Sequence, residues 1–99
     1  MDVKEHLLTC LSEEASEIIK DVSKSLRFGL SDRNVLNPTG PTNWERLIDE
    51  LNDLFAVVEM LTDRGILPPN WMDLDKIIAK KKKVEQFLDY AVKQGTIIF

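Results

Sequence analysis

Apolar residues recur at the helical period in three separate stretches, and this spacing limits the possible folds more than any other feature of the chain. The pattern predicts helices over about residues 3–26, 44–64 and 73–93. The first stripe is formed by Leu7, Leu8, Leu11, Ala15, Ile18, Ile19, Val22 and Leu26. We therefore expect an all-α protein, an up-down helical bundle of three main helices with additional short helices in the loops.

The segments between these stretches contain residues that end or start helices. Residues 37–41, Asn-Pro-Thr-Gly-Pro, cannot continue a helix and predict an irregular loop, and a connection this long is often functional. Thr42 or Asn43 is suited to cap the second helix. A glycine follows each predicted helix, at Gly29, Gly65 and Gly95.

Composition predicts one folded domain over residues 1–99. The chain is 43% hydrophobic and 30% charged, which is ordinary for a globular protein and argues against disorder. A domain of this size buries limited surface, which favours a homodimer or homotetramer. The net charge of −4 provides no overall positive field for nucleic acid, and no nucleic-acid partner is expected. The uncharged residues 96–99, apart from the terminal carboxylate, are expected to dock on the core or on a partner subunit.

The remaining composition points to a reducing compartment. Cys10 cannot form a disulfide within the chain, and with His6 it provides too few ligands for structural zinc. The first residues lack the layout of a signal peptide, and no apolar run approaches the roughly 20 residues that a membrane span needs. We therefore expect a cytoplasmic protein without a membrane partner.

Two sets of carboxylates lie at helical spacing on the first two predicted helices. Glu14 lies on the shoulder of the first apolar stripe, Glu17 just beyond it, and Glu13 further toward solvent. Glu50 and Asp53 form a similar edge on the second helix. If the two edges face each other, four or five acids share one pocket, where mutual repulsion and burial would favour a bound divalent cation.

A simpler interpretation remains open for the first set. An acidic triplet on a helix is usually a solvated face, with salt bridges here to Lys20 or Lys24. The position of the acids at stripe edges, and their recurrence on a second helix, are the two features that favour a metal site.

The pattern Glu-Glu-x-x-Glu at residues 13–17, followed by Glu-x-x-Asp at residues 50–53, resembles the signature of MazG-like all-α nucleoside triphosphate pyrophosphohydrolases. The resemblance extends over nearly the whole chain: an acidic helix, a loop, a second acidic helix ending near Asp-Arg-Gly, and a helix containing lysines. It implies a small single-domain protein of the type found in phages and bacteria.

The resemblance also implies a reaction and its residues. In that family Mg²⁺ holds the triphosphate while water attacks between the α- and β-phosphates, giving a nucleoside monophosphate and pyrophosphate; Mn²⁺ is a possible substitute. Carried over, the metal ligands are Glu14, Glu17, Glu50 and Asp53, and Glu13 binds a further metal or orients the water. The substrate would be an NTP or dNTP.

Positively charged and aromatic residues supply further candidates. Lys80 and Lys83 share a face of the third helix and could bind phosphate as point charges, although a run of lysines is more often a solvated face. Lys24 and Arg27 are comparable candidates. Trp44 or Phe28 could stack on a base, although each more often packs in a core or loop.

Two other functions compete with the enzyme. A non-enzymatic helical oligomerisation or interaction module would use the acid edges and the apolar tail as an interface. A di-iron carboxylate bundle is disfavoured, because such sites use Glu-x-x-His pairs and His6 is not in one.

Overall fold

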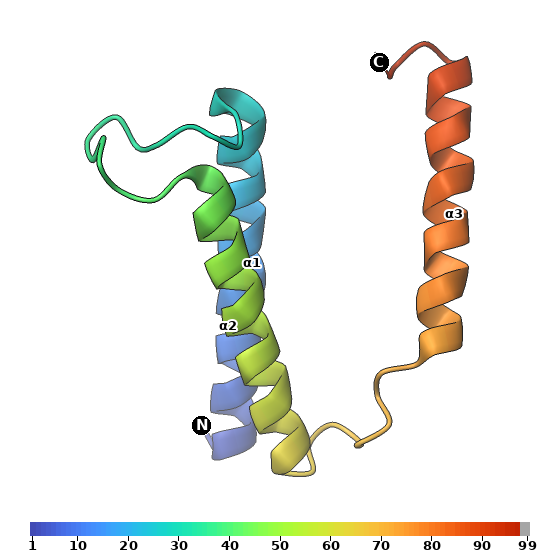
Figure 1. The fold of residues 1–99 in the computed structure, drawn as a ribbon. Coiled ribbons are helices and arrows are strands. Elements are labelled where there is room, and N and C mark those ends of the chain that lie inside the picture. Colours follow the sequence, from blue (N-terminus) through green and yellow to red (C-terminus); the bar gives the residue numbers. More distant parts are fainter. Residues whose placement is uncertain (98–99) are drawn as a thin grey trace. The chain divides into compact units, whose positions relative to one another are not determined.

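The computed structural model describes residues 1–97, in which every regular element is a helix. The helices are α1 (Val3–Phe28), α2 (Asn43–Asp63) and α3 (Leu74–Lys93) (Figure 1). The predicted all-α class is therefore confirmed. The expected docking of residues 96–99 involves Ile98 and Phe99, which lie outside the described residues. None of the three helices is long and apolar enough to cross a membrane.

The helix ends follow the capping signals in the sequence. The Asp2 carboxylate accepts a hydrogen bond of 2.7 Å from the Glu5 amide at the start of α1. Thr42 caps α2 in a capping box with Glu45, in which each side chain accepts a bond from the other residue's backbone. Gly29 ends α1 with φ +93°, a conformation that residues with a Cβ rarely adopt. α1 thus extends two residues further than predicted, to Phe28.

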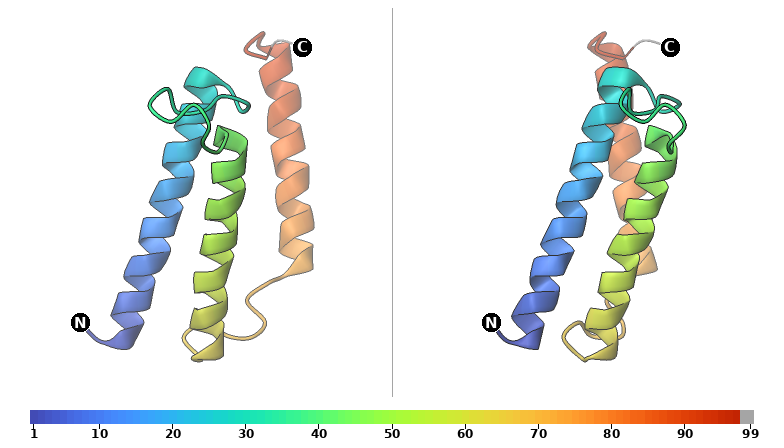
Figure 2. Two further views of the ribbon diagram at one scale, coloured as in Figure 1. Left: turned by 60° about the vertical axis from the view of Figure 1, so that its left-hand side comes forward. Right: turned by 90° about the vertical axis from the view of Figure 1, so that its left-hand side faces the viewer.

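Contacts divide the chain into two compact units, Met1–Pro69 and a second unit that begins at Asn70. In the first unit, α1 and α2 lie side by side and antiparallel, which can be seen in every view of Figures 1 and 2. The second unit contains α3. The single domain over residues 1–99 stays a prediction.

The loop over residues 29–42 holds turns and one isolated bridge, Arg33 with Thr42, rather than short helices. It is tied to the start of α2 by its own backbone. The Asn43 amide donates to the Asp32 carbonyl over 2.9 Å, and the Trp44 amide donates to the Leu30 carbonyl over 2.9 Å. These bonds use donors that the first turn of a helix leaves free, so the loop folds back without forming a helix of its own.

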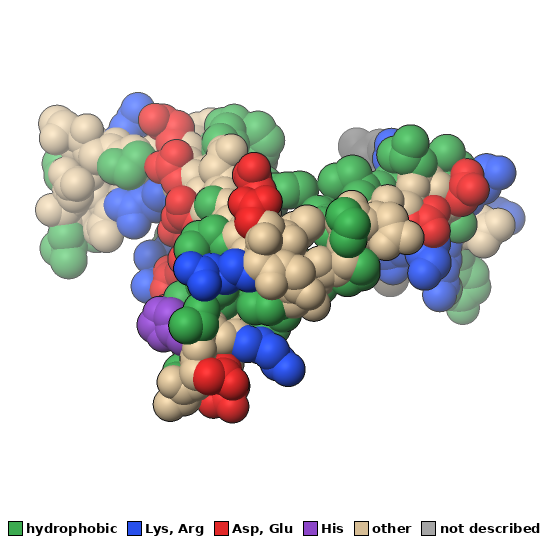
Figure 3. All heavy atoms as spheres, turned by 90° about the horizontal axis from the view of Figure 1, so that it is seen from below, with side chains coloured by type: hydrophobic (Ala, Val, Ile, Leu, Met, Phe, Trp, Pro, Cys, Tyr) green, Lys and Arg blue, Asp and Glu red, His purple; other side chains and the backbone are tan. Residues whose placement is uncertain are grey.

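The interior of the α1–α2 pair is apolar at one end and polar toward the other. Among residues 1–97, Leu7 and Leu61 are the apolar side chains that are buried, and the antiparallel arrangement places both at the end where α1 begins and α2 finishes. The buried polar residues, Asp21 and Asn43, lie toward the loop. Many other apolar side chains are exposed, and they lie at the surface of both units (Figure 3).

Candidate metal centre

The line of contact between α1 and α2, which we call the seam, brings three of the predicted ligands together. One carboxylate oxygen each of Glu14, Glu50 and Asp53 lies within 4.8 Å of the others. Glu14 comes from α1 and the other two from α2, one helical turn apart. We call these three residues the acid cluster. Glu14 and Glu50 are half-buried and Asp53 is exposed.

The other predicted site residues lie outside the acid cluster in the described part of the chain. Glu13 is on α1 and exposed, as expected for the most outward of the acids. The sequence predicts Glu17 to be a metal ligand, but it is exposed and is not part of the acid cluster. Lys80 and Lys83 are exposed on α3, in the second unit. Their proposed contact with phosphate stays a prediction.

Asp21 is an acidic residue near this site that the sequence did not single out. Its side chain is only 5% exposed, and its negative charge acts on Glu50. It follows Glu14 by seven residues, which is two helical turns, so both project from the same side of α1. The seven-residue spacing from Glu14 is the sequence feature that could have identified Asp21. It places Asp21 beside the apolar stripe of the first helix but does not predict that its side chain is buried.

The environment of Glu50 disfavours its negative charge. Burial raises the pKa of the Glu50 carboxyl above its ordinary value, and a hydrogen bond with Glu14 raises it further. The negative charges of Asp53, Glu14 and Asp21 act in the same direction. The environment of Glu50 therefore favours its protonated form.

The raised pKa of Glu50 predicts how stability depends on pH in metal-free buffer. The folded protein holds this proton more tightly than the unfolded chain, whose carboxyl has an ordinary pKa of 4.5. Stability should therefore rise as the pH falls from neutral through the folded pKa toward 4.5, and the gain should stop below that value. Glu50→Gln should remove this contribution and be more stable than the wild type at pH 7.

Urea unfolding with EDTA, between pH 7 and pH 4.5, measures this effect. The other acids titrate too, so the quantity to follow is the difference between the wild type and Glu50→Gln. An equal pH dependence in both proteins would contradict the prediction.

The donor chemistry of the acid cluster fits a hard divalent cation. Mg²⁺ binds oxygen at about 2.1 Å, so oxygens on opposite sides of the ion are about 4.2 Å apart. Adjacent oxygens in its octahedral shell are about 3.0 Å apart. The carboxylate oxygens of the cluster lie within 4.8 Å of one another, so side-chain rotations would have to draw them closer around an ion. Mg²⁺ commonly takes few protein carboxylates and completes its shell with water and phosphate oxygens, which agrees with three acids on an open seam.

Comparisons with known proteins yield no match: no family model, curated protein or solved structure is similar to this chain at a significant level.

Proposed function

We propose that the chain is a Mg²⁺-dependent nucleoside triphosphate pyrophosphohydrolase that converts an NTP or dNTP to the monophosphate and pyrophosphate. The observation that carries the proposal is the acid cluster, which gathers carboxylates from two helices that lie side by side. The raised pKa of Glu50 supports it, because a cation would offset the same repulsion that favours a proton. The resemblance of residues 13–17 and 50–53 to the MazG-like signature supplies the reaction.

The acid cluster supports the roles of Glu14, Glu50 and Asp53, and the other roles are carried over from the interpretation of the sequence. Glu14, Glu50 and Asp53 would hold the metal, and Glu17 would join them by turning inward from its exposed position. Bound Mg²⁺ would neutralise phosphate oxygens and lower the pKa of a water molecule. Glu13 would accept a proton from the attacking water as the bond between the α- and β-phosphates breaks. Lys80 and Lys83 would bind phosphate through their charge.

The exposed apolar surface supports a homodimer or homotetramer, and the cytoplasmic location rests on the interpretation of the sequence. Phe55 on α2 is 55% exposed and Phe87 on α3 is 62% exposed, and they are among many large apolar side chains that are exposed. Extended apolar surface of this kind marks a site of contact with another chain. The same observation favours the second candidate function, a non-enzymatic interaction module. Such a module would need no metal at the acid cluster.

Pyrophosphate release from a panel of ribo- and deoxyribonucleoside triphosphates, with Mg²⁺ and with EDTA, tests the proposal. We expect release from at least one triphosphate that requires Mg²⁺ or Mn²⁺. Mg²⁺ with that nucleotide should also raise the melting temperature, because a ligand that binds only the folded state stabilises it. Absence of release from every triphosphate, together with an unchanged melting temperature, would favour the interaction module.

A further inference from the structure

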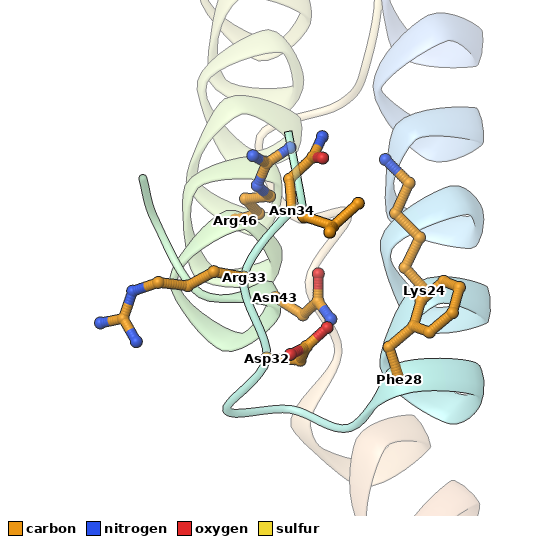
Figure 4. A pocket seen from close by; sticks show the side chains of 8 residues that line it. Lys24, Phe28, Asp32, Arg33, Asn34, Asn43 and Arg46 are labelled. Carbon is orange, nitrogen blue, oxygen red and sulfur yellow. The ribbon is translucent and has the colours of Figure 1, made fainter. Parts of the chain in front are cut away.

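A cavity of about 170 Å³ lies in the same unit as the acid cluster, where the end of α1, the loop and the start of α2 meet. Phe28 and Lys24 extend from α1 on one side, and Asn43 and Arg46 come from α2 on the other (Figure 4). Asp32 and Asn34 of the loop also line it. We call it the loop cavity.

The loop cavity continues the seam that holds the acid cluster. Arg46 precedes Glu50 by four residues, one turn of α2, and Lys24 follows Asp21 by three residues on α1. Asn43 lies seven residues before Glu50, about 10 Å along the helix axis. A nucleotide whose phosphates reach the acid cluster would therefore place its other end in the loop cavity.

The residues that line the cavity suit a planar ring with hydrogen-bond donors and acceptors at its edge. The lining is more apolar than polar and includes Val35 and the aromatic ring of Phe28, over which the Arg27 guanidinium lies 5.0 Å from the ring centroid. Arg46 Nε is buried and has no hydrogen-bond partner. Donors and acceptors beside an aromatic platform are what recognition of an unpaired base requires.

A phosphate group fits the cavity less well. The first three amides of α2, which could capture an anion, are already used: Asn43 and Trp44 donate to loop carbonyls, and Glu45 donates to the Thr42 hydroxyl. The carboxylate of Asp32 in the wall would also repel a phosphate, which offsets part of the attraction from Lys24 and Arg46. The Arg33 side chain points away from the other lining residues and donates to the Gly40 carbonyl over 3.0 Å (Figure 4).

The volume of the cavity and the hydrogen bonds that hold its loop also favour a single ring system as the ligand. Pockets for drug-sized ligands are typically about 300–1,000 Å³, so a cavity of 170 Å³ accepts a single ring system and not a whole nucleotide. The Asn43 side chain donates to the Gly29 carbonyl over 2.9 Å, and the Asn34 side chain accepts from the Leu36 amide over 2.9 Å. These bonds hold the loop in place before any ligand arrives, which lowers the ordering cost of binding.

We propose that the loop cavity binds the nucleobase of the nucleotide, with the base stacked on Phe28 and its polar edge read by Asp32 and Asn34. That the base belongs to a triphosphate rests on the proposed function. The base-binding site itself rests on the cavity.

The first test measures binding of nucleosides, which carry a base but no phosphate, to the full-length protein in EDTA by saturation-transfer NMR. We expect at least one ribo- or deoxyribonucleoside to bind at millimolar concentration. Phe28→Ala should weaken this binding at least about fivefold, because loss of an aromatic stacking partner typically costs about 1–3 kcal/mol per base. Phe55→Ala is the matched control, since Phe55 is an exposed phenylalanine on α2 that does not line the cavity.

A second variant tests recognition of the base edge. Asp32→Asn replaces one acceptor oxygen with a donor while the Asp32 backbone carbonyl can still accept from Asn43. It should change the rank order of the nucleosides, and melting curves would show that the protein stays folded. Rank orders that match the wild type would overturn the assignment of Asp32.

Failure of this proposal can be distinguished from failure of the proposed function. Nucleoside binding that depends on Phe28, without hydrolysis of any triphosphate, would support the base site and refute the enzyme. Mg²⁺-dependent hydrolysis with no nucleoside binding, or with equal effects of Phe28→Ala and Phe55→Ala, would refute the base site alone. Binding of inorganic phosphate but of no nucleoside in EDTA would also overturn it.

Discussion

Replacing Glu50 with glutamine is expected to reduce Mg²⁺-dependent pyrophosphate release by more than about 100-fold. Loss of a group that only supports a metal ligand typically costs 10–100-fold in affinity or activity, and Glu50 is proposed to be a ligand itself. One carboxylate oxygen of Glu50 lies within 4.8 Å of those of Glu14 and Asp53, so no other residue of the cluster can replace its oxygen without leaving its own position. Steady-state kinetics over a range of Mg²⁺ concentrations measures the effect.

The matched control is Glu59→Gln. Glu59 is an exposed glutamate of the same helix, nine residues from Glu50, which is half a turn around the helix axis. It should hydrolyse the nucleotide as the wild type does. Because Glu50→Gln removes a repulsive charge, it should remain folded, and its melting temperature in EDTA should equal or exceed that of the wild type. Full activity in folded Glu50→Gln would contradict the metal site.

Replacing Leu61 with alanine should destabilise the protein by about 2–5 kcal/mol, the range observed for buried leucines. Leu61 is 0% exposed and is the largest fully buried side chain among the described residues. With so few buried apolar side chains, the protein has little other packing to compensate for the cavity. A loss of 1 kcal/mol lowers the melting temperature by about 4–8 °C in a domain of this size, so a fall of more than about 8 °C is expected.

Leu26→Ala is the control that distinguishes the effect of burial from the effect of replacing any leucine. Leu26 is also a helical leucine, on α1, but it is 83% exposed, and its substitution should change stability by less than about 0.5 kcal/mol. Thermal unfolding monitored by circular dichroism at several protein concentrations gives both values. A loss of less than about 1 kcal/mol for Leu61→Ala would contradict the importance of Leu61. An equally large loss for Leu26→Ala would indicate that a second copy covers Leu26.

The helices could be predicted from the sequence because their signals are local. Apolar spacing, the Thr42 cap and the three terminal glycines each act within a few residues, and α1, α2 and α3 begin and end within two residues of the predicted bounds. The pairing of Glu14 with Glu50 and Asp53 could also be inferred, since it requires only that two acidic edges of adjacent antiparallel helices face each other.

Other features were decided only by the tertiary structure. They depend on how α1 and α2 are rotated about their own axes and on how the loop folds back onto the start of α2. A helical wheel places Asp21 just beyond the apolar stripe, but its burial depends on how closely α2 approaches. Helical spacing also groups Glu17 with Glu14, yet Glu17 remains exposed. The contact with α2 covers only part of the acidic side of α1. The loop cavity depends on the hydrogen bonds from residues 43 and 44 back to the loop, which join residues that no periodic pattern relates. Local spacing therefore determined the helices and their acidic edges, while long-range packing selected which acids meet and created the cavity beside them.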